Sequence, residues 1–344
     1  MTRIPSPSEL AEILPLAPGD QAAIAEMRSA LQNIMDRFDD RLLIITGPCS
    51  IHDHDSAIEY ADKLAELSGQ VSDTCLLMMR VYVEKARTRH GWTGLVYDPD
   101  LDGSYDLENG LYTARKLFLE LAKRKVPVAT ELLNPLVYPY LSDLVTWGCI
   151  GARTVTSQPH RQLASGTPFP VGFKNNIDGN VDVAIDAVLA ARKSHTFFNA
   201  HDAGHISKTT TIGNPYTHLV LRGAKDNTNY DLCSLRNIQE TLDAQDLDCR
   251  ILVDCSHGNC QGFEQRQKEV FLSTLENIAD GSCDVMGLML ESHLEKGKQR
   301  NVGSKSHPNR SITDPCIDWP DTSSLILWAH KALAQDRDPT LLVQ

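Results

Sequence analysis

The stretch LLIITGPC, residues 42–49, is a short and almost wholly apolar run that stops at a proline and a cysteine. Eight similar runs follow it along the chain: LLMMRVY (76–82), PVATEL (127–132), CIGARTV (149–155), PVGFKN (170–175), HTFFNA (195–200), HLVLRG (218–223), RILVDCSH (250–257) and DVMGLMLES (284–292). Helix-like segments such as SAIEYADKLAEL (56–67) lie between them, with apolar residues every three or four positions. Apolar strands that alternate with amphipathic helices are typical of a parallel sheet buried on both faces.

One run, HTFFNA, does not fit this alternation. The segment after it, HDAGHISKTTTIGNPYTH, is rich in β-branched and turn residues rather than helical in pattern. We therefore predict that residues 195–217 form a β-ribbon inserted between the fifth and sixth strands. The other eight runs predict an α/β protein with a (β/α)8 barrel, the TIM-barrel fold, over residues 41–344. Residues 1–40 combine Pro-rich and helical stretches and predict an N-terminal helical extension.

The composition disfavours several classes of protein. The formal net charge of −12 argues against binding to nucleic acid or to a membrane surface. No stretch approaches the roughly 20 apolar residues of a membrane span, and the N-terminus lacks a hydrophobic signal core. The nine cysteines are scattered and form no CxxC pair. Such cysteines are typical of reduced thiols, so we expect a cytoplasmic protein.

Each of the eight strand-like runs ends in or near a residue that can bind or react. These residues are Cys49, Arg80, Glu131, Arg153, Lys174, Arg222, His257 and Glu291. In a (β/α)8 barrel, the carboxyl ends of the strands meet on the face that holds the active site. A capping or salt-bridging role would explain any one of these residues, but it explains the whole set poorly. The pattern therefore predicts an enzyme active site at this face.

Four of the strand-end residues are cations, namely Arg80, Arg153, Lys174 and Arg222. The planar guanidinium group binds phosphate or carboxylate through two parallel hydrogen bonds. Four cations at one mouth need more than one negative charge to balance them, and a phosphate together with a carboxylate would do so. Phosphoenolpyruvate is one molecule that carries both groups.

A second group mixes soft and hard metal ligands. Cys49, His257, Glu291 and the later Asp314 offer a thiolate, an imidazole and two carboxylates. Such a set suits one divalent transition metal ion, such as Mn, Fe, Co or Zn, better than Mg or Ca. The four residues are far apart in the sequence, so their spacing does not test the idea. An equally good interpretation of His257 is a core histidine whose hydrogen bonds are made within the protein.

Several segments together resemble a known family, the type I 3-deoxy-D-arabino-heptulosonate 7-phosphate (DAHP) synthases. They include GPCSIHD (47–53), MRVYVEKART (79–88), GART (151–154), PVGFKN (170–175), VDCSHGN (253–259), ESHLEKGKQ (291–299) and SITDPCIDW (311–319). The resemblance implies condensation of phosphoenolpyruvate with D-erythrose 4-phosphate and water, the first step of the shikimate pathway. It also implies a homodimer or homotetramer, with the extension and the ribbon carrying subunit contacts and a site for an aromatic amino-acid effector.

The resemblance also assigns roles to individual residues. It places the metal on Cys49, His257, Glu291 and Asp314, and makes Lys85, His257 and Cys49 catalytic. It places phosphoenolpyruvate on Arg80, Lys85, Arg153, Lys174 and Arg222, with Glu131, Gly151 and Ala152 lining the site. It places the aldose phosphate on Arg87 and Thr88, with Asp314 near the sugar.

The chain departs from the family pattern beside the expected aldose site. Lys85-Ala86-Arg87-Thr88 replaces the family's Lys-Pro-Arg-Thr, and alanine restricts the backbone less than proline. Val155-Thr156 and Ala224 replace the family's Thr-Glu and Gly. These changes keep open an alternative, a synthase of the same scaffold that joins phosphoenolpyruvate to a different aldose phosphate.

Three further alternatives fit the residues less well. An open α/β sheet shows the same alternation, but neither GxGxxG nor GxxxxGK[ST] follows a strand. A barrel that has lost catalysis would have little reason to keep the ligand and cation sets. A metal-dependent aldolase that does not use phosphoenolpyruvate leaves the four cations unexplained.

Overall fold

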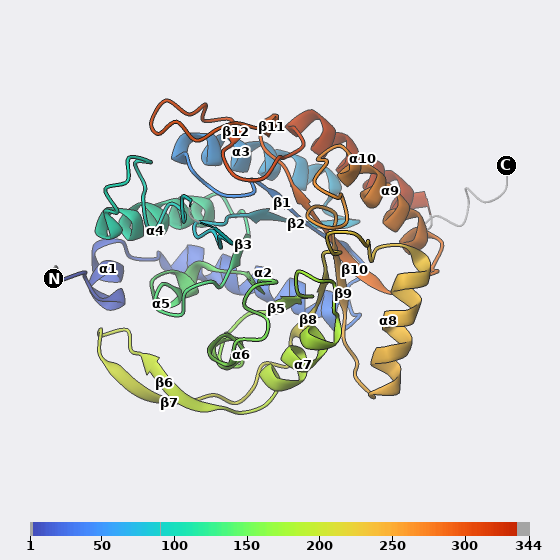
Figure 1. Ribbon diagram of the computed structural model, residues 1–344, viewed down its shortest axis with the longest axis horizontal. Helices are drawn as coiled ribbons and strands as arrows, with labels where there is room; N and C mark the ends of the chain where they lie inside the picture. Colours follow the sequence, from blue (N-terminus) through green and yellow to red (C-terminus); the bar gives the residue numbers. More distant parts are fainter. Residues whose placement is uncertain (1–2, 90, 336–344) are drawn as a thin grey trace.

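The computed structural model describes residues 3–89 and 91–335 and contains a closed barrel of eight parallel strands (Figure 1). Its strands are β1 (Leu42–Gly47), β2 (Cys75–Arg80), β3 (Val128–Glu131), β4 (Trp147–Ile150), β5 (Val171–Lys174), β8 (Thr217–Leu221), β9 (Ile251–Asp254) and β10 (Val285–Glu291). They are hydrogen-bonded in the order β1-β10-β9-β8-β5-β4-β3-β2, and β1 closes the ring by pairing with both β2 and β10. The predicted (β/α)8 barrel is confirmed.

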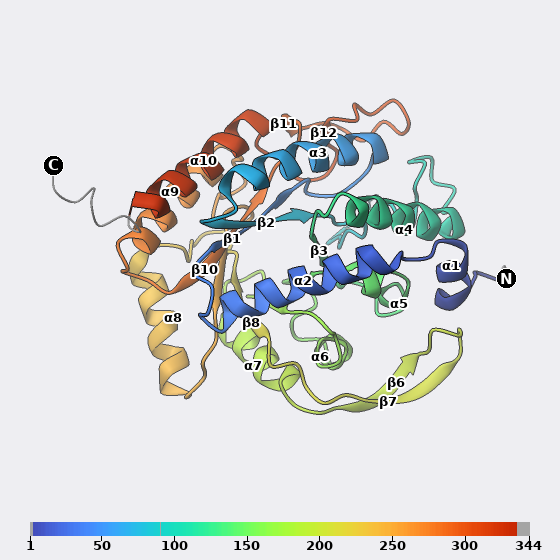
Figure 2. The same ribbon diagram turned by 180° about the vertical axis from the view of Figure 1, so that it is seen from behind.

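Helices surround the barrel, as the alternating pattern predicts (Figures 1 and 2). They are α3 (His54–Val71), α4 (Leu107–Lys123), α5 (Tyr138–Leu141), the 3-10 helix η1 (Ser142–Leu144), α6 (Gln158–Ala164), α7 (Asp182–Ala191), α8 (Leu232–Ala244), α9 (Arg266–Ala279) and α10 (Trp319–Gln335). Because each strand packs against helices outside and side chains inside, seven of the eight barrel strands are buried at every position along their length and β3 at all but its last. None of the helices in residues 3–89 and 91–335 is both long and apolar enough to cross a membrane.

The N-terminal extension forms two helices, α1 (Pro7–Ile13) and α2 (Pro18–Met35). Ser6 begins α1 with a capping box, because its side chain accepts from the Glu9 amide while the Glu9 carboxylate accepts from the Ser6 amide. Helix α2 contributes Leu31, Ile34 and Met35 to the apolar cluster that fills the barrel interior. It therefore closes one end of the barrel.

The inserted ribbon consists of β6 (Thr196–Ala200) and β7 (Ile206–Thr210), which pair antiparallel between α7 and β8. The predicted ribbon after the fifth barrel strand is confirmed, and its two strands lie within the predicted range 195–217, whose last residue belongs to β8. Both figures show the ribbon reaching away from the barrel toward α1. The contact is direct, since the Ser8 amide donates to the carbonyl oxygen of Asp202 at 2.9 Å.

Several strands end earlier than the apolar runs predicted. Arg80, Glu131, Lys174 and Glu291 are the last residues of their strands. Cys49, Arg153, Arg222 and His257 instead lie in the loops that follow. Strand β1 stops at Gly47, whose φ of +156° is one that residues with a side chain rarely adopt, and Pro48 after it has no amide hydrogen to continue the ladder.

Candidate active site at the barrel mouth

A cavity of about 620 Å³ opens at the carboxyl ends of the strands. Its lining includes every residue predicted to bind substrate: Arg80, Lys85, Arg87, Thr88, Glu131, Gly151, Ala152, Arg153, Lys174, Arg222 and Asp314. His257 and Glu291 also line it. Residues spread over more than 230 positions of the chain thus meet at one mouth, as expected for a barrel.

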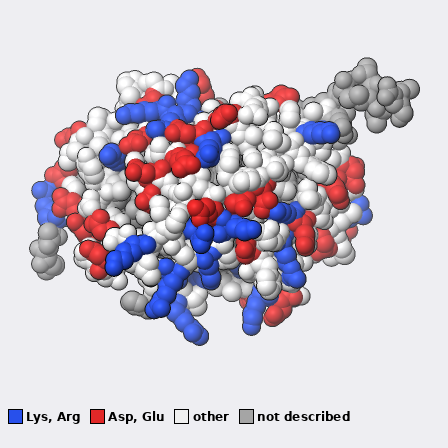
Figure 3. Space-filling view, turned by 90° about the horizontal axis from the view of Figure 1, so that it is seen from above, with Lys and Arg blue, Asp and Glu red and all other residues white. Residues whose placement is uncertain are grey.

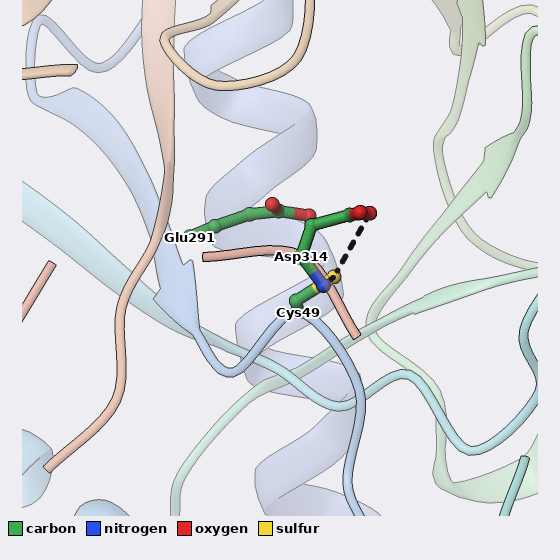
Figure 4. Close-up of side chains that lie close together, drawn as sticks. All are labelled: Cys49, Glu291 and Asp314. Carbon is green, nitrogen blue, oxygen red and sulfur yellow. Dashed lines mark hydrogen bonds between the residues drawn. The ribbon is translucent and has the colours of Figure 1, made fainter. Parts of the chain in front are cut away.

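Three of the four predicted metal ligands gather tightly. The ligand atoms of Cys49, Glu291 and Asp314 all lie within 4.8 Å of one another (Figure 4). Gly47 of β1 pairs with Glu291 of β10, which brings Cys49 beside that carboxylate. The Ile317 amide donates to the Glu291 carbonyl oxygen at 3.0 Å and holds the segment that carries Asp314 against β10.

His257, the fourth predicted ligand, lies next to these three residues but is not part of their tight cluster. Its Nε2 is 3.6 Å from Oε1 of Glu291. Its Nδ1 is 2.9 Å from Oδ2 of Asp254, which orients the ring. Burial lowers the pKa of His257, although Asp254 and Glu291 oppose that shift. A lowered pKa favours the neutral imidazole, the form that binds metals.

The donor set fits a transition metal ion. A thiol and two carboxylates converge, with an imidazole beside them, and this mixture of soft and hard donors differs from the all-oxygen shells of Mg and Ca. Burial, followed by the charge of Glu291, raises the pKa of the Cys49 thiol to about 12. The thiol must lose its proton to bind a metal, so metal binding at this site should release a proton.

Lys85 lies at the centre of this region. Its Nζ is 2.7 Å from Sγ of Cys49 and 3.2 Å from Oδ2 of Asp314. Burial on its own would lower the pKa of Lys85, but the charges of Cys49, Asp314 and Glu291 outweigh it and raise the pKa above its usual range. Lys85 in turn lowers the pKa of Asp314. The lysine is therefore a fixed cation, and Asp314 is ionised.

The other cations divide into paired and unpaired groups. Arg80 is buried, donates to Glu291 at 2.9 Å and stacks 3.5 Å over the ring of Tyr82. Lys174 donates to Asp254 at 2.7 Å. Three arginines, in contrast, form no ion pair with a carboxylate of the described chain; they are Arg87, Arg153 and Arg222. The mouth therefore holds positive charge that an anionic ligand can neutralise.

Two loops of the mouth contact each other through Arg153. Its Nε and Nη2 donate to Oγ1 of Thr88 at 2.9 and 2.7 Å. The loop after β4 is thereby joined to the loop after β2. A Cβ on Gly151 would approach Oε1 of Glu131 to 2.1 Å, so a larger residue there would displace that carboxylate from its position.

The sequence analysis missed Asp254, the buried carboxylate at the end of β9. It is fully buried and accepts hydrogen bonds from Lys174 and from the amide and hydroxyl groups of Ser256, besides its contact with His257. Its neighbours His257 and Lys174 overcome the effect of burial and lower the pKa of Asp254. The signal for Asp254 in the sequence is a carboxylate at the end of the apolar run ILVD. The predicted strand instead continues to His257.

The residues that depart from the family pattern lie at the rim of the mouth. Ala86 and Ala224 line the cavity, and so does Arg89, which follows the altered loop together with His90. Thr156 lines a neighbouring hollow that Arg153 and Lys225 share. His90 lies outside the described residues. The changes therefore surround the expected aldose side of the cavity and leave its deeper part unaltered.

A second cavity, of about 500 Å³, lies beneath the ribbon. Its lining includes Phe197 of β6, Thr209 of β7, Gln32 of α2, Tyr138 of α5 and Phe169. The hollow combines aromatic walls with hydroxyl and amide groups, which suits a small ligand with both polar and aromatic parts.

The known proteins that this chain resembles in sequence and in structure are phospho-2-dehydro-3-deoxyheptonate aldolases, which are DAHP synthases. The model of the DAHP synthetase I family matches residues 17–326. The Trp-sensitive phospho-2-dehydro-3-deoxyheptonate aldolase of Escherichia coli K12 is 44% identical over 322 residues, which cover 93% of this chain and 92% of the relative. The Tyr-sensitive enzyme of Salmonella typhimurium is 42% identical over 331 residues, covering 96% and 93%. The structure of the aldolase from Francisella tularensis SCHU S4 superposes with a TM-score of 0.95 at 37% identity and covers 98% of this chain and 99% of its own.

Proposed function

The chain belongs to the DAHP synthetase I family, and we propose that the barrel-mouth cavity performs the reaction with the residues described above. The chain is a DAHP synthase, which condenses phosphoenolpyruvate with D-erythrose 4-phosphate and water to give DAHP and phosphate, the first step of the shikimate pathway. The observation that carries the assignment of the site is the meeting of unpaired arginines with the Cys49, Glu291 and Asp314 trio in one cavity.

One divalent transition metal ion, Mn, Fe, Co or Zn, would be held by Cys49, His257, Glu291 and Asp314. When bound, it would supply Lewis-acid polarisation of the aldehyde oxygen. Asp254 supports this assignment, because its contact with Nδ1 of His257 leaves Nε2 turned toward Glu291.

Phosphoenolpyruvate would occupy the deeper cations. Arg80 and Lys174 are buried and held by carboxylates, so they present a fixed positive surface. Arg153 and Arg222 have no carboxylate partner among the described residues and are available for the phosphate and carboxylate groups. A substrate whose phosphate and carboxylate groups are both held in this way is oriented before the reaction. Much of the entropic cost of the reaction is then met by binding.

The aldose phosphate would bind at the rim, on Arg87 and Thr88. Lys85 lies between this rim and Cys49, with Nζ also within reach of Asp314. It is placed to donate a proton or a hydrogen bond to the oxygen that gains negative charge when C3 of phosphoenolpyruvate attacks the aldehyde. Water then adds at C2, and the phosphate leaves with cleavage of the C–O bond.

We also propose feedback by an aromatic amino acid that binds in the cavity beneath the ribbon. Phe197, Tyr138 and Phe169 supply aromatic contacts there, and the walls come from the N-terminal extension as well as from the ribbon. This placement would link the effector site to the two elements expected to carry the contacts of a homodimer or homotetramer. We also propose a cytoplasmic location, because scattered cysteines without a CxxC pair are typical of reduced thiols.

A panel of aldose phosphates, each supplied with phosphoenolpyruvate, tests the assignment by measuring phosphate release. We expect erythrose 4-phosphate to give the highest kcat/KM, and one aromatic amino acid added to the reaction to inhibit it. A markedly better aldose of another length would favour the alternative synthase that the Ala86 loop keeps open. A full rate in the presence of a strong chelator would contradict the role of the metal.

A further inference from the structure

The loop between β2 and α4, residues 81–97, carries the side chains proposed to handle the aldose phosphate. Its two arms run alongside each other, since the Lys85 amide donates to the Thr93 carbonyl oxygen at 2.8 Å and the Val96 amide donates to that of Val83 at 3.1 Å. Lys85 and Arg87 both line the cavity. The position of both side chains therefore depends on how firmly the base of this loop is held.

Glu84 holds that base. It precedes Lys85 in the chain, and only 4% of it is exposed. Its Oε1 is 2.8 Å from the Tyr97 hydroxyl group, at the far end of the same loop. Its Oε2 accepts from the Asn134 amide at 3.3 Å, and Nδ2 of Asn134 is 3.0 Å from the Tyr97 oxygen. Asn134 belongs to the turn after β3, so this cluster fastens the loop to the turn that follows Glu131.

Nothing in this cluster neutralises a negative charge on Glu84. None of the lysines, arginines and histidines in residues 3–89 and 91–335 forms an ion pair with it. The ionisable groups that act on it are Tyr97, on the opposite arm of its loop, and Glu131, at the end of β3. A carboxylate that is buried without a cation is costly, and a second carboxylate adds repulsion. Burial, only partly opposed by the hydrogen bonds of Tyr97 and Asn134, raises the pKa of Glu84 to about 7.

We propose that Glu84 is a positioning residue, whose carboxyl group clasps the base of the 81–97 loop to the turn after β3 and clasps it most firmly when it carries a proton. The inference rests on the proposed function, because the benefit of a firm loop is the placement of Lys85 and Arg87 for the aldose phosphate. In the neutral form, one oxygen accepts from the Asn134 amide while the other shares its proton with the Tyr97 oxygen. In the ionised form, both carboxylate oxygens still accept hydrogen bonds, but no cation of the described residues compensates the negative charge.

The direction of the pH effect follows from linkage. When the loop opens, Glu84 returns to water and to its ordinary pKa of 4.5, whereas in the closed loop the pKa is about 7. Closing therefore takes up a proton between these two values. The added stability of the closed loop is fully present below the lower pKa and is lost as the pH rises through the higher one. Above pH 7 the loop should be held more weakly.

Glu84→Gln tests the proposal, because glutamine has the shape of the protonated carboxyl group and cannot ionise. The measurement is the ratio of the wild-type KM for erythrose 4-phosphate to that of the variant, at matched pH values from 5.5 to 8. We expect the ratio to be smallest at pH 5.5, to rise by at most about tenfold per pH unit and to level off above pH 7. The KM for phosphoenolpyruvate should change less, because Lys85 is the one residue of its proposed site that lies on this loop. Glu66→Gln, which alters an exposed carboxylate on α3, is the matched control.

Amide hydrogen exchange of residues 83–89 gives a second readout that does not involve the substrate. In the wild type, exchange corrected for its intrinsic pH dependence should accelerate between pH 5.5 and 7 and level off above pH 7, and in Glu84→Gln it should not change with pH. Superimposable wild-type and variant profiles in both measurements would overturn the proposal, and so would an equal rise in the KM of both substrates.

Two further variants separate the possible failures. Tyr97→Phe keeps the ring but removes the hydroxyl group that joins Glu84 to Asn134, so it should raise the KM for the aldose phosphate at every pH. It also serves if Glu84→Gln does not fold, and an unchanged KM would then count against the clasp. An Arg87→Ala variant with a normal KM for the aldose phosphate would instead overturn the placement of that substrate. In that case, the amide hydrogen exchange of residues 83–89 would be the test of the clasp.

Discussion

Replacing Asp254 with asparagine would test how the barrel supports its proposed metal site. The side chain is fully buried and contacts Lys174 at 2.7 Å and His257 at 2.9 Å. Asparagine has nearly the same shape but carries no charge and has only one acceptor oxygen. Lys174 and His257 both contact Oδ2, whereas the amide and hydroxyl groups of Ser256 donate to Oδ1, so the asparagine amide group would face donors in either orientation.

Two magnitudes follow from these contacts. Loss of the carboxylate that orients a metal-binding histidine typically lowers metal affinity about 10- to 100-fold, which corresponds to roughly 1.4–2.8 kcal/mol. Leaving the buried Lys174 ammonium without its partner should lower the free energy of unfolding by about 3–5 kcal/mol. The variant should thus be less stable even without metal, and the addition of metal should stabilise it less than it stabilises the wild type.

The assay is a competition for Co²⁺ or Zn²⁺ against a chromogenic chelator, combined with thermal unfolding with and without the metal. Asp246→Asn is the matched control, because Asp246 is exposed in the turn that precedes β9 and its positive φ suits asparagine. If Asp254→Asn bound metal as tightly as the wild type, the carboxylate would not support His257. If its stability without metal were also unchanged, the reasoning about Lys174 would fail as well.

Two further substitutions test the remaining assignments. Cys49→Ala should reduce activity to near background and lower the metal content of the purified protein, and full activity after chelation without added metal would refute the ligand assignment. Arg87→Ala should raise the KM for the aldose phosphate by about tenfold or more while changing that for phosphoenolpyruvate little, since a charged hydrogen bond contributes roughly 1.5–3 kcal/mol. The reverse pattern would place the aldose elsewhere.

The fold could be predicted from the sequence because each barrel strand is buried on both sides. Continuous apolar runs such as LLIITG are unmistakable, and the change to a β-branched, turn-rich pattern after His195 marks the ribbon. The ends of the strands were less certain. Arg222 and His257 follow their strands by one and three residues, because the strands end where glycine and polar residues replace apolar ones.

The site could be predicted only in outline. Side chains at the ends of parallel strands must converge, so the set of cavity residues followed from topology. Which residues touch within the set depends on loop conformation, which periodicity does not encode. The contact of Lys85 with Cys49, the support of His257 by Asp254 and the bridge from Arg153 to Thr88 are all of this kind. The buried carboxylate of Glu84 cannot be distinguished in the sequence from an ordinary surface charge.

Helix α2 has a consequence for experiments on the N-terminal extension. Because Leu31, Ile34 and Met35 fill one end of the barrel, a chain shortened by its first forty residues would expose the interior apolar cluster to solvent. Such a deletion would lower solubility and yield, whatever it did to feedback by an amino acid. An inactive truncated protein would then reflect an uncapped core, and shortening the chain only as far as Ala17 is the cleaner way to separate regulation from folding.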